Sequence, residues 1–326
     1  MTTTHVIRFD IAGDPSVLQY VEVALADPGP GEVQIRHTAI GVNFIDTYHR
    51  SGLYPVKFPS GLGQEGAGVV EKLGPGVTEF KVGDRVAYPT GALGSYSQRR
   101  NVAAARLVPV PEGVPDDVVA GSLMRGMTAQ YLLKQTFLVQ PGMTVLIHAA
   151  AGGVGQIACQ WAQALGATVI GTVGSAAKAR LARPFCDHVI DYTNEHFAER
   201  VHLLTGNKGV PVVYDGVGAA TFEGSLDCLA PRGLLVSFGN ASGPVAPFSP
   251  NVLAQKGSLY LTRPTLGNYT ATRAELLAVA ADYFAVLASG KVSVQVNQRY
   301  ALADAAQAHR DLESRKTTGS TVLIPD

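Results

Sequence analysis

The chain has 326 residues, of which 46% are hydrophobic and 16% are charged. This length and composition suit a globular protein with room for two domains, and they exclude a disordered tail or linker. Lys and Arg number 26, as do Asp and Glu. No overall field therefore draws the chain to an anionic membrane or to nucleic acid, and we expect neither as a partner.

The cysteines and the first residues indicate a cytoplasmic protein. Cys159, Cys186 and Cys228 are scattered and form no CxxC pair. A disulfide framework or a structural zinc lobe is therefore not predicted, and the reducing cytosol fits best. The first residues do not combine a basic start with an apolar stretch, and no run of about 18 apolar residues occurs.

Residues 1–125 contain short strand-like runs separated by turns rich in proline and glycine. The runs lie at 33–40, 66–73, 85–88 and 106–109. Because few long amphipathic helices intervene, this part is predicted to form a compact, mostly antiparallel β domain.

From about Met127 strands and helices alternate. Strands are predicted at 145–149, 168–173, 188–190, 212–214 and 234–238, and helices beginning near Val154, Ser175, Asn194 and Ala219. Strict alternation of this kind is typical of an α/β fold with a doubly wound parallel sheet.

The tail breaks this alternation. It predicts a long helix at 273–289, a second at 303–314 and a final strand at 321–324. We expect this segment to return to the first domain, so that residues 1–125 and 265–326 form one domain and residues 126–264 the other.

The most informative motif is an apolar strand that leads into a glycine-rich turn and an amphipathic helix at 144–165. Such a crossover binds dinucleotides, because small residues let the backbone approach a pyrophosphate and the helix start offers free N–H groups. The residues expected to meet the pyrophosphate are Gly152, Gly153, Val154 and Gly155. Ala150 replaces the usual first glycine, which is tolerable only if the turn needs no positive φ there.

The residues after the second strand of this unit indicate which dinucleotide binds. An acid there would accept hydrogen bonds from the ribose 2′-OH of NAD, but the chain has Gly174 and Ser175, with Lys178 in the next helical turn. A missing carboxylate and a nearby cation favour a 2′-phosphate. We predict NADPH, with Tyr192 also beside the adenosine; alternatively, Lys178 is a solvated helix residue.

Several stretches, at 41–48, 51–55, 63–66, 82–86, 149–155 and 236–240, together resemble the medium-chain dehydrogenase/reductase superfamily. The resemblance is closest to its zinc-free quinone oxidoreductase branch, which includes the zeta-crystallins, and it covers essentially the whole chain. It implies a GroES-like β domain that holds substrate, a Rossmann domain that holds NADPH, and a cleft between them. It also implies a homodimer formed by Rossmann edge strands, for which 258–262 is our candidate; an ordinary terminal strand is the alternative.

Zinc-dependent members of this superfamily hold their catalytic metal with a Cys where this chain has Asn43 and a His where it has Gln64. Neither amide is a useful zinc ligand, and the eight histidines form no ligand cluster, so we expect no metal. Reduction of a quinone or an activated double bond needs less help than alcohol oxidation, because the acceptor itself delocalises the incoming charge. Glu65 and Asp46 are expected to make structural hydrogen bonds, as is His148.

The resemblance also implies a set of site residues. Near the nicotinamide it places Asn43, Tyr48, Thr128, Phe238, Gly239, Asn240 and Ala241, and less firmly Arg263 and Arg315, which could equally be ion-pair residues. Near the acceptor it places Asn43, Tyr48, Tyr54 and Gln64, whose amide or phenol groups could donate hydrogen bonds to a quinone oxygen. Either tyrosine could supply a proton, but packing residues or solvent would serve as well.

These observations predict an NADPH-dependent quinone oxidoreductase. An alkenal or enone reductase would share the cofactor and the hydride geometry, so it stays open as the alternative. A non-enzymatic role as a crystallin or RNA-binding protein is a third reading, which the zero net charge disfavours.

Overall fold

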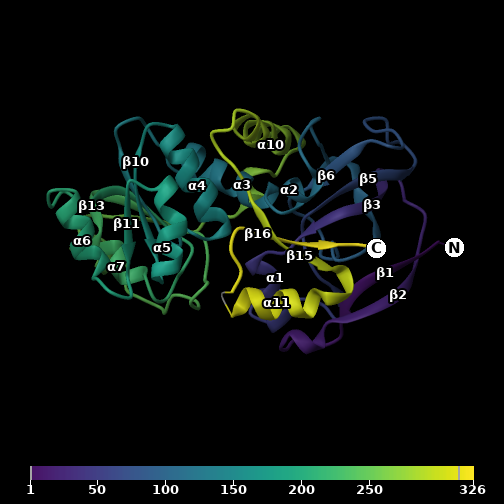
Figure 1. Cartoon of the computed structure of the whole chain (residues 1–326), viewed down its shortest axis with the longest axis horizontal. Helices are drawn as coiled ribbons and strands as arrows, with labels where there is room; N and C mark the ends of the chain where they lie inside the picture. Colours follow the sequence, from purple (N-terminus) through teal and green to yellow (C-terminus); the bar gives the residue numbers. More distant parts are fainter. Residues whose placement is uncertain (1, 315) are drawn as a thin grey trace. The chain divides into compact units, whose positions relative to one another are not determined.

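The computed structural model describes residues 2–314 and 316–326. The chain divides into two compact units (Figure 1). Unit 1 comprises Met1–Met124, Thr270–Phe284 and Val294–Asp326, and unit 2 comprises Arg125–Tyr269 and Ala285–Ser293. In the described part of the chain no helix has the length and apolar character needed to cross a bilayer.

Unit 1 is built on a mostly antiparallel sheet. Its strands follow the order β15-β16-β3-β5-β6-β8, with β7 also paired to β3, and a smaller sheet has the order β2-β1-β4. Their bounds are β1 Thr2–Phe9, β2 Gln19–Leu25, β3 Glu32–Gly41, β4 Ser60–Gly61, β5 Gly66–Leu73, β6 Arg85–Tyr88, β7 Arg99–Ala103, β8 Val108–Pro109, β15 Val296–Ala301 and β16 Ser320–Ile324. Buried apolar side chains such as Val33, Ile35 and Val86 form one core of this unit.

The helices of unit 1 are short except one. They are α1 Phe44–Ser51, α2 Asp116–Ala120, α11 Ala305–Glu313 and most of α10 Arg273–Ala288, with 3-10 turns at Pro15–Val17, Ala104–Arg106 and Leu302–Asp304. The predicted strand at 106–109 was wrong at its start, because the backbone N–H of Leu107 closes the 3-10 turn on the carbonyl of Ala104. Neither α1 nor β15 was predicted.

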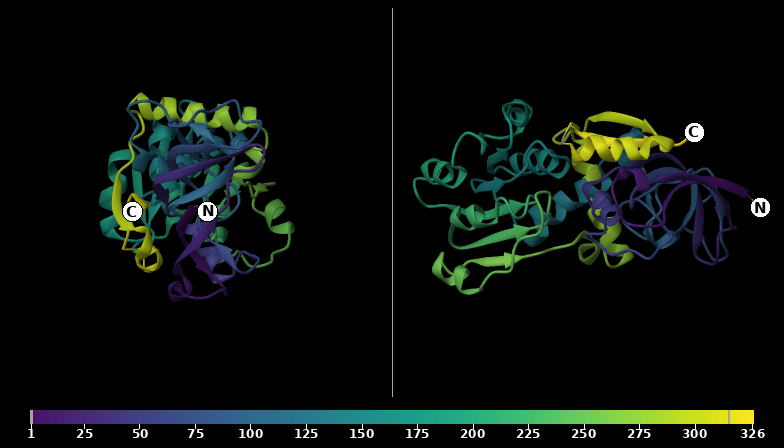
Figure 2. Two further views of the ribbon diagram at one scale, coloured as in Figure 1. Left: turned by 90° about the vertical axis from the view of Figure 1, so that its right-hand side faces the viewer. Right: turned by 90° about the horizontal axis from the view of Figure 1, so that it is seen from below.

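The tail of the chain completes the large sheet of unit 1. Val322 and Leu323 of β16 pair antiparallel with Gly41 and Ile40 of β3, and β15 pairs with β16 in parallel. Helix α11, drawn in yellow, lies next to α1 (Figures 1 and 2). The first and last parts of the chain therefore share one sheet.

Unit 2 is a parallel sheet with the strand order β11-β10-β9-β12-β13-β14. The strands are β9 Thr144–Ile147, β10 Thr168–Val173, β11 His188–Asp191, β12 Val210–Asp215, β13 Leu229–Ser237 and β14 Tyr260–Thr262, and every pairing is parallel. The order reverses between β9 and β12, which is the Rossmann pattern and creates a ligand-binding switch point there. With the antiparallel unit, this confirms the predicted fold class.

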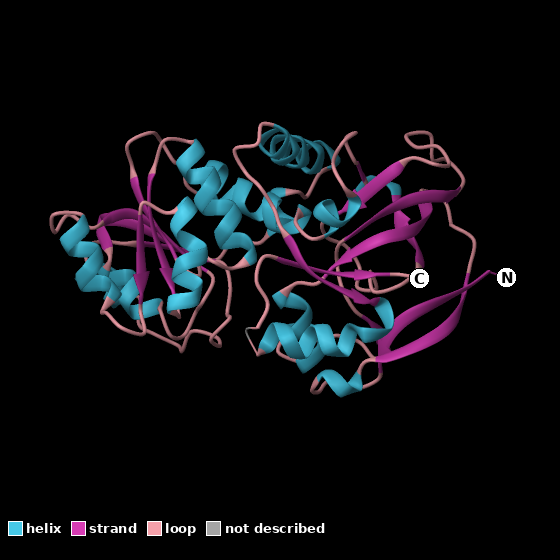
Figure 3. Cartoon of the chain, viewed as in Figure 1, coloured by secondary structure: helices cyan, strands magenta, loops and turns pink. Residues whose placement is uncertain are grey.

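Helices connect the strands of unit 2 (Figure 3). They are α3 Leu123–Tyr131 with a π-helical turn Leu132–Thr136, α4 Gly153–Ala164, α5 Ala176–Ala182 with a 3-10 turn Arg183–Phe185, α6 Phe197–Leu204, α7 Phe222–Asp227, α8 Asn251–Gln255 and α9 Leu266–Tyr269. The starts predicted near Asn194 and Ala219 were too early. Asp191 binds the side chain of Asn194, and Asp215 binds the amides of Val217 and Gly218, so each carboxylate holds a turn before its helix.

Candidate functional site

The glycine turn between β9 and α4 is tightly folded. Ala149 has a φ of 52°, and its carbonyl accepts the N–H of Gly152 at 2.8 Å. A Cβ on Gly155 would lie 2.2 Å from that carbonyl oxygen, so only glycine lets α4 start this close to β9. The residue with positive φ is Ala149 and not Ala150. The condition for replacing the usual first glycine by Ala150, that this position needs no positive φ, is therefore met.

The start of α4 has the features of an anion site. Gly152 is the N-cap residue and no side chain caps the helix, so the first N–H groups of this 12-residue helix lack intrahelical partners. A Cβ on Gly153 would lie 2.8 Å from the side chain of Arg125, which is only 7% exposed. This guanidinium adds positive charge beside the turn. Sequence reasoning missed Arg125, which lies outside the motif.

His148, just before the turn, connects two strand ends through a directed hydrogen-bond chain. Asp215 can only accept when ionised, so the hydroxyl of Ser225 donates to it at 2.9 Å. Ser225 then accepts from Nε2 of His148 at 2.9 Å, and Nδ1 of His148 accepts from Thr172 at 2.7 Å. The pKa of His148 is lowered, because the effect of burial is larger than the opposing effect of the charge of Asp215. The prediction that both ring nitrogens are satisfied locally is confirmed. The strand predicted at 145–149 was too long at its end, because β9 ends at Ile147 and His148 lies in the turn that follows.

The residues predicted around the 2′-phosphate gather at the end of β10. Ser175 caps α5 and accepts the backbone N–H of Lys178 at 3.3 Å. A Cβ on Gly174 would lie 2.5 Å from the Tyr192 hydroxyl, so this phenol lies directly against the glycine. The arrangement places a backbone free of side chain, a hydroxyl and a lysine within one helical turn.

A second group follows the end of β13. The N–H of Phe238 donates to the carbonyl of Asp215 at 2.8 Å, and a Cβ on Gly239 would lie 2.4 Å from the carbonyl oxygen of Gly216. Arg263 donates to the carbonyl of Ser237 at 3.0 Å. The 238–241 segment and Arg263 therefore lie near each other, on the neighbouring ends of β12, β13 and β14.

In unit 1 the N-terminus of α1 is held by buried carboxylates. Asn43 donates its side-chain N–H to Glu65 at 2.6 Å and its backbone N–H to Asp46 at 2.8 Å. Glu65 also accepts the amide of Met124 at 2.7 Å, and Asp46 accepts the hydroxyl of Tyr96 at 2.9 Å. Both acids are fully buried. The prediction that they make structural hydrogen bonds is confirmed.

The tail of the chain secures the other end of α1. Arg50 makes two hydrogen bonds to the carboxylate of Glu313, at 2.8 and 2.7 Å, and a third of 3.3 Å to Nδ1 of His309. Because the guanidinium can only donate, that nitrogen accepts, and Nε2 of His309 donates to the hydroxyl of Tyr96 at 3.1 Å. Burial, with the charge of Arg50, lowers the pKa of His309 to about 3.

Aromatic side chains of α1 form a cluster with Tyr54 of the loop that follows it. The ring centroids of Tyr48 and Tyr54 are 5.2 Å apart, and those of Phe44 and Tyr48 are 5.6 Å apart. His49 lies 5.7 Å from the ring of Tyr54 and 3.0 Å, nitrogen to nitrogen, from the side-chain amide of Gln64. Tyr48, Tyr54 and Gln64 were predicted; His49 was not.

The predicted site residues thus form separate groups within the two units. Four of them are in unit 1, in or near α1: Asn43, Tyr48, Tyr54 and Gln64. The remaining described ones belong to unit 2. Thr128 is a half-buried residue of α3. Arg315 lies outside the described residues. Among residues 2–314 and 316–326, no group of three or more His, Cys, Asp or Glu is arranged to hold a metal ion.

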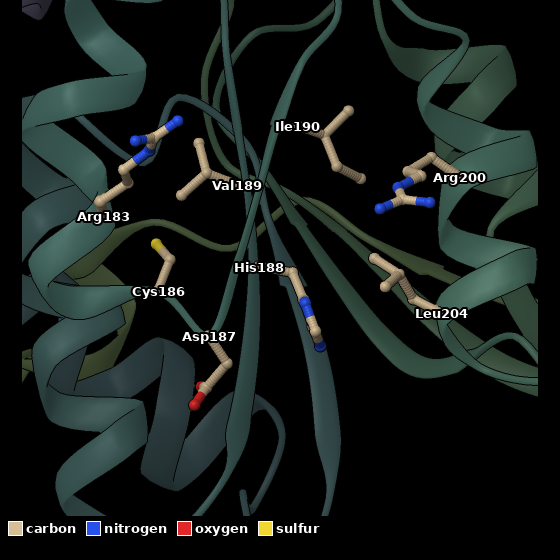
Figure 4. Close-up of a pocket in the computed structure, with 8 residues that line it drawn as sticks. All are labelled: Arg183, Cys186, Asp187, His188, Val189, Ile190, Arg200 and Leu204. Carbon is tan, nitrogen blue, oxygen red and sulfur yellow. The ribbon is translucent and has the colours of Figure 1, made fainter.

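Unit 2 also has a pocket of about 430 Å³ against β11. Figure 4 shows Arg183 and Arg200 approaching it from different helices, with His188 between them. The carboxylate of Asp187 accepts a hydrogen bond from the backbone N–H of Val169 at 2.8 Å. The pocket involves the beginning of β11, and none of the predicted cofactor residues lines it.

Comparisons with known proteins agree with this architecture. Residues 29–141 match the alcohol dehydrogenase GroES-like domain family, and residues 153–282 match the zinc-binding dehydrogenase family. The quinone oxidoreductase of Pseudomonas aeruginosa is 56% identical over 98% of this chain and 99% of its own length. A 2-haloacrylate reductase of Burkholderia is 48% identical over 96% of each chain.

A solved structure shows the same relationship. The Escherichia coli quinone oxidoreductase, complexed with NADPH, has a TM-score of 0.97 and 51% identity, and the match covers 99% of this chain and all of that one. Identity at this level over whole chains establishes a family. The chain belongs to the zinc-free quinone oxidoreductase branch of the medium-chain dehydrogenase/reductase superfamily.

Proposed function

We propose that this protein is an NADPH-dependent quinone oxidoreductase. The observation that carries the proposal is the uncapped start of α4, where Gly155 brings the helix against Ala149 and Arg125 adds a cation. This cradle suits a pyrophosphate, and the group at the end of β10 suits a 2′-phosphate because it combines Lys178 with the capping Ser175. Relatives named quinone oxidoreductases support the acceptor class.

Each unit has a distinct role in this proposal. Residues 126–264 form the NADPH-binding domain, in which Gly152, Gly153, Val154 and Gly155 meet the pyrophosphate. Thr128, the 238–241 segment and Arg263 lie on the nicotinamide side. Residues 1–125 and 265–326 form the substrate domain, although Arg125, 265–269 and 285–293 cluster with unit 2.

The reaction needs one hydride and one proton for each quinone. Bound NADPH supplies the hydride from C4 of its nicotinamide, and a proton on the quinone oxygen completes the hydroquinone while NADP⁺ leaves. In the substrate domain, Asn43 is held rigidly by Glu65 at 2.6 Å, so it can orient an acceptor with little loss of freedom. Tyr48, Tyr54 and Gln64 supply further polar groups beside it.

Two measurements test the function. Purified protein is expected to enhance or shift the fluorescence of NADPH at micromolar concentration, and to oxidise NADPH when a naphthoquinone is added. Absence of both would refute the proposal. A small enone run beside the quinone tests the alternative, which the similarity to a 2-haloacrylate reductase favours. Faster turnover of the enone would make the protein an enone reductase with the same cofactor site.

The proposal extends to assembly and location. We propose a homodimer through β14, which ends the strand order of unit 2, pairs only with β13 among the described strands, and carries a Tyr260 side chain that is 62% exposed. Such an edge can pair with a second copy. Sedimentation velocity giving the monomer mass would contradict this. Three free, buried cysteines fit the cytoplasm, where thiols stay reduced.

A further inference from the structure

The side chain of His49 contacts both Tyr54 and Gln64. Its ring is 5.7 Å from that of Tyr54, at an interplanar angle of 72°, and Tyr54 in turn contacts Tyr48. The backbone N–H of Tyr54 donates to the carbonyl of Tyr48 at 3.0 Å, which fixes the loop against α1. The imidazole is thus held against Tyr54, which in turn contacts Tyr48, and both phenols are proposed to meet the acceptor.

The contact with Gln64 determines where the imidazole carries its proton. The side-chain nitrogen of Gln64 can only donate, so Nε2 of His49, 3.0 Å away, accepts. A ring nitrogen that accepts has no hydrogen, and the proton of the neutral ring is therefore on Nδ1. Burial lowers the pKa of His49, so the neutral ring is the stable form at neutral pH.

The Nδ1–H of His49 is buried and has no hydrogen-bond partner in the described part of the chain. A buried donor without a partner is destabilising, because it has lost its hydrogen bonds to water and gained none in the protein. The cost is removed when a ligand brings an acceptor oxygen to that position. A donor of this kind beside Tyr54 has the chemistry to recognise a conjugated carbonyl, in which the oxygen gains negative charge as a hydride arrives.

We propose that Nδ1–H of His49 donates a hydrogen bond to the carbonyl oxygen of the acceptor, and that Gln64 is a positioning residue that selects the tautomer. The inference rests on the proposed function, since it assigns the group that meets the acceptor. It gives Gln64 a definite role, which is to fix the tautomer of His49. It also makes a neutral imidazole the donor at the acceptor oxygen.

Two substitutions separate the ring nitrogens. In His49→Asn the amide nitrogen takes the place of Nδ1, and in His49→Gln it takes the place of Nε2. With tetramethyl-1,4-benzoquinone, H49Q is expected to lower kcat/KM about tenfold, which is about 1.4 kcal/mol, and H49N to recover most of that loss. NADPH Kd stays at the wild-type value in both. His188→Gln, on an exposed histidine, is the matched control. Equal kcat/KM for H49Q and H49N would overturn the inference.

A spectroscopic measurement decides the matter independently of turnover. In ¹⁵N-labelled protein without NADPH, long-range ¹H–¹⁵N correlations should show His49 as the Nδ1–H tautomer, and Gln64→Leu should shift it toward Nε2–H. The quinone alone should then move the Nδ1 resonance. An Nε2–H tautomer in the wild type, or no response to the quinone, refutes the inference. Failure of the proposed function is distinct, because the wild type would then show no quinone-dependent oxidation of NADPH.

Discussion

Substitution of Gly155 by alanine is expected to destabilise the NADPH-binding unit and to weaken cofactor binding. The new Cβ would lie 2.2 Å from the carbonyl oxygen of Ala149 and 2.9 Å from both its carbonyl carbon and Cα of Ala150. All three are backbone atoms that cannot rotate away. Overpacking costs about 1–3 kcal/mol, and a rigid backbone contact belongs at the upper end, so we expect a loss of about 3 kcal/mol.

Thermal unfolding and a fluorescence titration with NADPH measure the two effects. For a domain of 150–250 residues each kcal/mol corresponds to about 2–4 °C, so the midpoint should fall by about 6–12 °C, and NADPH Kd should rise. Gly267→Ala is the control, because it lies in α9 of the same unit and its Cβ would meet nothing within 4 Å. If G155A melted and bound NADPH like G267A, the close approach of α4 to β9 would not be what requires the glycine.

Two further predictions concern charge. Lys178→Ala should lower the preference for NADPH over NADH about five- to tenfold, which corresponds to about 1–1.4 kcal/mol for a partly solvated ion contact. Arg180→Ala on the same helix is the control and should leave this preference unchanged. If the two variants had the same NADPH-to-NADH preference, Lys178 would not belong to the 2′-phosphate site. His37, buried and accepting the hydroxyl of Tyr88 at 2.8 Å, has its pKa lowered to about 3 by burial, below the unfolded value of about 6.5. The contribution of the neutral imidazole to stability is therefore complete above about pH 6.5. As the pH falls from there toward 3, the free energy of unfolding declines by about 1.4 kcal/mol per pH unit. An NMR titration of His37 with its midpoint near pH 6.5 would contradict this prediction.

Local patterns were sufficient to predict much of the fold. Strands β5, β6 and β10 begin and end where the apolar runs placed them, because each run is bounded by turn residues. Helix α1 was missed because its eight residues carry few apolar side chains, although Asn43 and Asp46 have the spacing of a capping box. Strand β15 was missed because Asn297, Gln298 and Arg299 in its middle are polar and none of its residues is buried, so no apolar run marks it.

The residues of the candidate site were likewise predicted only in part. The glycine spacing and Lys178 were visible in the sequence because their roles depend on neighbours within one crossover. Arg125 and His49 were not, because each acquires its role from a contact made only in the fold: Arg125 approaches Gly153, and His49 meets Gln64. Pairs separated along the chain leave no periodic signal in a single sequence.

The pairing of β16 with β3 has a consequence during translation. Gly41 and Ile40 leave the ribosome before the nucleotide-binding unit, unit 2, but their partners Val322 and Leu323 emerge only after all of it. That unit can fold while the chain is still growing, whereas the end of β3 at Ile40 and Gly41 lacks its partner until synthesis reaches β16. The vulnerable nascent species is therefore the amino-terminal unit, and a chaperone that shields exposed edges would act there.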